Sequence, residues 1–142
     1  MKYELFSYVD WSKLNEEQRV KYKKASLELA HDFVLSNYCP IKQSTKRTSI
    51  YTHKHLFQAI TGVYLLTEEY EQVFRDCGYD ISGHNGCHNN ISKKSYNMLV
   101  DKESIISFKR EWQSRLIKLL EIYGCKNITV KHYINENALE FD

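Results

Sequence analysis

Four side chains of the types that bind zinc lie close together in the stretch 77–88: Cys77, His84, Cys87 and His88. Their spacing lacks the paired C-x2-C and H-x3-H arms that make zinc motifs specific. The glycine and asparagine residues around them favour a turn, because both residue types readily adopt positive φ. We therefore predict a turn without metal or cofactor. A zinc-stabilised module or zinc enzyme on these four residues is kept as an alternative.

Two further histidines, His53 and His55, stand two positions apart on a predicted helix, where they do not share a face and cannot chelate one ion together. No serine, cysteine or carboxylate arrangement near them resembles an activated nucleophile. The residues 84–89 are too crowded to span the hairpin and helix of a His-Asn-His nuclease. Phosphate-binding loops and zinc-protease motifs are also missing. The sequence predicts a protein that acts by binding and is not an enzyme.

Basic and hydroxyl-bearing residues gather between residues 41 and 54, in a part of the chain that has no acidic residue from 41 to 67. Lysine, arginine and threonine are the usual contacts to nucleic-acid phosphates. The members of this strip are Lys42, Thr45, Lys46, Arg47, Thr48, Ser49 and Lys54. The next predicted helix, 67–77, is acidic instead and would repel phosphate. Any nucleic acid is therefore expected to contact the basic strip and Lys93–Lys94 rather than this helix.

Capping residues, glycines and apolar periodicity predict one α+β domain over residues 1–142, with about four helices packed on a small antiparallel sheet. Helices are expected over 15–38, 51–61, 67–77 and 101–124. Strands are expected over 2–9, 90–100 and 127–134, and an irregular linker over 41–49. The middle region 45–97 fits a winged helix-turn-helix arrangement, with helices 53–61 and 67–77 followed by a hairpin wing carrying Lys93 and Lys94.

The 142 residues carry a net charge of +2 with 27% charged residues, a balance typical of a folded domain. No apolar run reaches the roughly 18 residues of a membrane span, so no membrane contact is expected. Charged residues interrupt the N-terminal apolar run, which argues against a signal peptide. We predict a bacterial cytosolic protein, in which the four cysteines are free thiols.

Residues of the middle region resemble a group of small proteins carried by phages and mobile elements of Gram-positive bacteria. The resemblance rests on Lys54, His55, Thr61, Gly62, Tyr64, Gly78, Tyr79, Asn90, Ser92, Lys93, Lys94 and Ser95. The chain departs from the group at Gly86 and Cys87, where an asparagine–tryptophan pair is usual. The resemblance implies a mobile-element gene, and small accessory proteins in that context often block host defence nucleases, as anti-CRISPR proteins do.

These observations lead to three functional hypotheses. The first is a non-enzymatic accessory protein that binds and inhibits a host defence protein such as a CRISPR effector. The second is a winged-helix-like regulator that binds duplex DNA, and the third is the zinc protein. The expected contact surface combines both charges with tyrosines, which suit protein interfaces. It comprises Lys46, Arg47, Tyr51, Lys54, Tyr64, Glu68, Glu69, Glu71, Lys93, Lys94 and Tyr96, with Tyr70 as a further tyrosine nearby.

Overall fold

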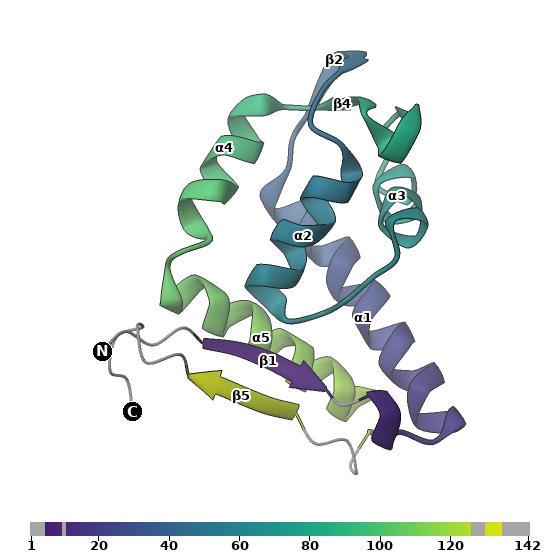
Figure 1. Cartoon of the computed structure of the whole chain (residues 1–142), viewed down its shortest axis with the longest axis vertical. Coiled ribbons are helices and arrows are strands. Elements are labelled where there is room, and N and C mark those ends of the chain that lie inside the picture. Colours follow the sequence, from purple (N-terminus) through teal and green to yellow (C-terminus); the bar gives the residue numbers. More distant parts are fainter. Residues whose placement is uncertain (1–4, 10, 126–129, 135–142) are drawn as a thin grey trace.

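Two small antiparallel sheets lie at opposite ends of a group of helices (Figure 1). The computed structural model describes residues 5–9, 11–125 and 130–134. Strand β1 (Leu5–Val9) pairs with β5 (Val130–Ile134), with Leu5 opposite Ile134. The first and last predicted strands are thus confirmed where they are described, and residues 2–4 and 127–129 lie outside the described residues. A short 3-10 helix, η1 (Trp11–Lys13), follows β1.

Helix α1 (Glu16–Asn37) is the longest helix of the described chain. It starts with the predicted capping box, in which Asn15 accepts from the backbone N–H of Gln18 and the Gln18 side chain accepts from that of Asn15. It ends at Tyr38, just before Pro40, as expected for a residue that cannot continue a helix. Its buried face packs against helices α3 (Thr67–Asp76) and α5 (Ile106–Ile122).

Helix α2 (Ile50–Thr61) runs through the middle of the molecule (Figure 1). The Ser49 side chain accepts from the backbone N–H of Thr52 at its start, and Gly62 ends it at φ 77°, a conformation that favours glycine. Aromatic rings join α2 to its neighbours, since Phe33 lies 5.0 Å from both Phe57 and Trp112 between ring centroids. The predicted helices 51–61 and 67–77 are therefore confirmed, and their buried faces form the core.

The second sheet has the order β2-β4-β3, with β2 (Pro40–Lys46), β4 (His88–Ile91) and β3 (Ile81–Ser82). The prediction of an irregular linker over 41–49 was wrong for β2. This strand lies mostly exposed at the sheet edge, so backbone pairing with β4 holds it without an apolar pattern. The register slips along the pair, because Pro40 faces Ile91 whereas Thr45 already faces Asn89.

A fifth helix, α4 (Lys93–Lys102), replaces most of the strand predicted over 90–100. Ser92 caps it by accepting from the backbone N–H of Ser95. Ser95 and Leu99 are buried one turn apart, whereas Met98 and Val100, which mimicked a strand period, are exposed. The predicted wing was wrong, because Lys93 and Lys94 form the first turn of a helix. The α+β class is nevertheless confirmed.

The last predicted helix also begins later than expected. Asp101 was expected to cap it but lies inside α4, and α5 starts after Ile105. Its apolar stripe faces the core through Trp112, Leu116 and Leu120. The expected helix type is confirmed, and the early start was wrong because the chain breaks between two helices at residues 103–105.

Candidate anion-binding site

A pocket of about 300 Å³ lies where the end of β2, strand β4 and the first turns of α2 and α4 come together. Three cationic side chains line it: Lys46, Arg47 and Lys93. Two threonine hydroxyls and an apolar and aromatic surface complete the wall, contributed by Thr45, Thr48, Ile91 and Tyr96. No carboxylate of the described residues lines the pocket, so its electrostatic character is positive.

The backbone around the pocket is fixed by the β2–β4 pairing. The Arg47 N–H donates to the Cys87 carbonyl at 2.7 Å, and Lys46 stands opposite His88 in the register. The buried Asn89 amide donates to the carbonyls of Thr48 at 3.0 Å and Gly86 at 2.8 Å. These bonds hold the end of β2 with Lys46, and Arg47 directly after it, against the strand β4 that leads into α4, where Lys93 lies.

His53 forms the buried inner wall of the pocket, with only 1% of the residue exposed. Its Nδ1 lies 2.9 Å from the Tyr38 hydroxyl, and its ring packs edge-on against Tyr96 at 4.8 Å between centroids. Burial lowers the pKa of His53 to about 4, so the imidazole is neutral at pH 7. In the tautomer that carries its proton on Nε2, Nδ1 accepts from the Tyr38 hydroxyl and Nε2 is a donor.

Among the described residues, no acidic side chain neutralises the cations of the pocket. Lys46, Arg47 and Lys93 make no ion pair with any described carboxylate, and the buried Arg47 Nε has no hydrogen-bond partner among the described residues. A buried donor without a partner is unfavourable, so an anion accepting from it would stabilise the site. Helices α2 and α4 carry no acidic residue in their first turns, which leaves their positive dipole ends uncompensated. The geometry therefore suits an anionic ligand.

The predicted contact surface divides into separate parts in the structure. Lys46, Arg47, Lys93 and Tyr96 come together in the pocket, whereas Lys94, although next to Lys93, is exposed and is not among the lining residues. His53 was considered only as a metal ligand or base, and its place in the inner wall was missed. Neither its spacing from other histidines nor local periodicity signals this role, because the pocket is formed by contacts between distant segments.

A second part of the predicted surface surrounds Lys54. Its Nζ lies 4.5 Å from the ring centroid of Tyr64 and 5.5 Å from that of Tyr51. Lys54 itself is buried, but Tyr51 and Tyr64 are 46% and 54% exposed. These three residues, the Tyr51–Lys54–Tyr64 cluster, form a cation–π arrangement that keeps two aromatic rings at the surface.

The acidic residues lie on a different helix, α3. Glu69 is bound within the protein, since its Oε1 lies 3.1 Å from Lys23 Nζ on α1 and accepts from the Leu66 N–H at 2.8 Å. Glu68 is exposed and Glu71 is partly buried on the same helix, and neither lines the cationic pocket. Tyr70 is fully buried, so its expected place on a protein-binding face was wrong.

The predicted turn is confirmed over residues 83–87, whereas β3 and the start of β4 on either side of it were not predicted. Gly83 and Gly86 have φ values of 79° and 68°, and Asn85 has φ 51°. Gly86 also lies against the core, because a Cβ there would overlap Ile50 Cγ1. Across the described chain, no three side chains of histidine, cysteine, aspartate or glutamate gather in a way that could hold a metal ion. The alternative zinc set Cys77, His84, Cys87 and His88 is thus not assembled.

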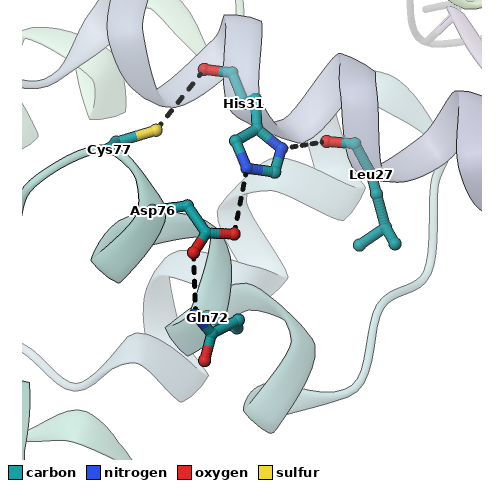
Figure 2. A network of polar contacts seen from close by, with 5 residues as sticks. All are labelled: Leu27, His31, Gln72, Asp76 and Cys77. Atoms are coloured by element: carbon teal, nitrogen blue, oxygen red, sulfur yellow. Dashed lines mark hydrogen bonds and ion pairs between the residues drawn. The ribbon is translucent and has the colours of Figure 1, made fainter.

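Another polar network joins α1 to the end of α3 (Figure 2). His31 Nδ1 lies 2.8 Å from the Leu27 carbonyl and its Nε2 lies 3.4 Å from Asp76 Oδ2. The Cys77 thiol points to the His31 backbone carbonyl rather than to the imidazole, at 4.0 Å. Burial raises the pKa of Cys77, which makes a thiolate less favourable. The network joins two helices and does not form an activated cysteine–histidine pair.

Comparisons with protein-family models, with curated proteins and with solved structures find no match for this chain. No helix within the described ranges is both long and apolar enough to cross a membrane.

Proposed function

We propose that this protein binds nucleic acid through the cationic pocket and performs no chemistry on it. The observation that carries the proposal is the convergence of Lys46, Arg47 and Lys93 without a neighbouring carboxylate in the described chain. Arginine and lysine are the main protein contacts to phosphate, and the buried Arg47 Nε is ready to donate. The Thr45 and Thr48 hydroxyls add donors of the kind that position a phosphate backbone.

The rest of the pocket supports binding over catalysis. Its buried imidazole, on His53, is neutral, and among the described residues it contacts the Tyr38 hydroxyl and makes no hydrogen bond to Thr45 or Thr48. Nucleophilic catalysis needs a hydroxyl or thiol held against a general base. No residue of the acidic helix α3 lines the pocket, so we propose contact through the pocket itself rather than through a recognition helix in the major groove.

Fluorescence anisotropy with labelled oligonucleotides tests this proposal. Binding should weaken as salt rises from 50 to 200 mM, because phosphate contacts release counterions. Lys46→Ala and Lys93→Ala should each weaken binding and reduce the salt slope by about 0.7 to 0.9 per lost phosphate contact. Lys42→Ala and Lys94→Ala are matched controls, because these lysines lie on the same strand and helix turn outside the pocket lining. Equal effects of pocket and control variants would contradict the proposal.

The Tyr51–Lys54–Tyr64 cluster favours a second proposal, that the protein occludes a host defence nuclease such as a CRISPR effector. Exposed tyrosines held by a neighbouring cation lose little conformational entropy when a protein partner covers them, and tyrosine is enriched at binding hot spots. The resemblance to mobile-element proteins gives this surface a context. Occlusion needs no catalytic group on the inhibitor.

Cleavage assays with a panel of purified CRISPR nucleases test the second proposal. The protein should slow cleavage by at least one nuclease, and Tyr64→Ala should relieve the inhibition. Met98→Ala is the control, because Met98 is similarly exposed on a different helix, α4. Full cleavage by every nuclease at saturating protein would reject this role and would leave the nucleic-acid proposal intact.

A further inference from the structure

The size of the cationic pocket restricts what part of a nucleic acid can enter it. Its volume of about 300 Å³ is at the lower end of the range for small-molecule sites and far below what a duplex occupies. The major groove of a DNA duplex is by itself about 12 Å wide, so a duplex can only rest across the opening. A single nucleotide at the end of a strand has no such restriction. The shape favours a chain end over a double helix.

The charge of the pocket points to the same kind of group. Lys46, Arg47 and Lys93 supply three positive charges, and no lining residue of the described chain supplies a negative one. A phosphate inside a strand is a diester with one negative charge, whereas a terminal phosphate monoester carries about 1.5 to 2 negative charges at pH 7. The monoester also presents three oxygens to donors instead of two. It is the better electrostatic match for three cations.

The inner wall has suitable chemistry for the rest of a nucleotide. Tyr96 and Ile91 provide an aromatic and an apolar surface next to the cations, and aromatic side chains stack on bases with little regard to sequence. His53 also lines this space, and its Nδ1 is already in contact with the Tyr38 hydroxyl at 2.9 Å. These groups suit a sugar and base and are not required by phosphate alone.

We infer that the pocket holds the phosphorylated end of a single-stranded nucleic acid, with the monoester among Lys46, Arg47 and Lys93 and the terminal nucleotide against Tyr96. This inference rests on the proposed nucleic-acid binding and specifies which part of the polymer is recognised. The binding requires no covalent step.

The test compares oligonucleotides of one unstructured sequence that carry a 5′-phosphate, a 3′-phosphate or hydroxyls at both ends, with the same sequence as a blunt duplex. We expect one phosphorylated end to compete at least about tenfold better than the hydroxyl-ended strand. Lys93→Gln and Lys46→Gln should each remove this preference, whereas Lys94→Gln should keep it. Circular dichroism and thermal unfolding of each variant confirm that it is folded.

Three results would overturn the inference. Equal binding of phosphorylated and hydroxyl-ended strands, with both weakened by Lys93→Gln, would leave nucleic-acid binding standing and remove the preference for an end. If no oligonucleotide binds, both this inference and the proposed nucleic-acid binding are overturned. Displacement of the phosphorylated strand by a phosphoserine peptide at equal concentration would show that the pocket recognises a monoester irrespective of nucleic acid. Inorganic phosphate is included to measure how much the phosphate contributes by itself.

Discussion

Replacing Lys93 by glutamate should make the protein more stable and weaken its binding of nucleic acid. Lys93 is the first residue of α4 after the Ser92 cap, where the helix dipole presents partial positive charge. Lys94 adds a second positive charge in the same turn, and Lys46 and Arg47 line the same pocket as Lys93. A positive residue at this place opposes stability, which is a common feature of binding sites.

The size of the effect follows from the helix dipole. A carboxylate in the first turn contributes about 0.3 to 1 kcal/mol, and a lysine there is unfavourable by a similar amount. The charge reversal should therefore raise the free energy of unfolding by about 1 kcal/mol. For a chain of this length, that corresponds to an increase in Tm of about 2 to 4 °C. The gain should shrink in 1 M salt, because the group is exposed to screening.

Urea unfolding and oligonucleotide anisotropy measure the two effects on the same preparations. Lys94→Glu is the matched control: it changes the dipole in the same way but lies outside the pocket lining, so it should gain similar stability and lose less affinity. A Lys93→Glu variant that unfolds at lower urea concentration than the wild type would refute the electrostatic reasoning. An unchanged affinity would refute the role of the pocket.

Three further predictions concern the inner wall, the turn and the thiols. Burial lowers the pKa of His53 to about 4 from its usual 6.5, so on acidification the imidazole takes up a proton in the unfolded state before it does so in the folded state. The free energy of unfolding should therefore fall by up to about 3 kcal/mol as the pH drops from 6.5 through 4. Urea unfolding of His53→Gln over the same pH range should lack this decrease. Gly86→Ala should lower the free energy of unfolding by about 2 to 4 kcal/mol, because alanine is strained at positive φ and its Cβ overpacks the core. Gly78 has φ 94° but open space around it, so Gly78→Ala should lower the free energy of unfolding by only about 1 to 2 kcal/mol in the same urea assay. Because its pKa is raised, Cys77 should react with a thiol reagent at pH 7 more slowly than the exposed Cys39. Timed labelling followed by peptide mass spectrometry measures both rates. Faster labelling of Cys77 would contradict the assignment of an inert thiol.

The helices were predictable where local signals and core packing agree. The Asn15 capping box and the Gly62 terminus are local features that the tertiary structure retains. Strand β2 and helix α4 were not predictable in this way. Strand β2 is held by backbone pairing with β4 and has no apolar face. In α4, the exposed apolar residues Met98 and Val100 imitate the alternating pattern of a strand.

The candidate site, like the fold, was predictable from the sequence only in part. The cations Lys46, Arg47 and Lys93 could be selected from the sequence, because charge concentration is visible there. Their grouping around His53 could not, since it depends on the β2–β4 register and on a ring contact with Tyr96 in a helix that had been expected to be a strand. That the acidic residues of α3 do not line this pocket was not visible in the sequence either. Sequence distance does not indicate the direction of a side chain.

The slipped register between β2 and β4 has a practical consequence. Between its paired positions, β2 advances from Pro40 to Thr45 while β4 moves only from Ile91 to Asn89, so several β2 residues have no partner opposite them. This excursion lies at the extremity of the molecule, away from the β1–β5 sheet (Figure 1). Chain length can change here while both anchoring pairs are kept. The segment is thus a natural place to graft a fluorescent label whose signal responds when a molecule settles beside Lys46.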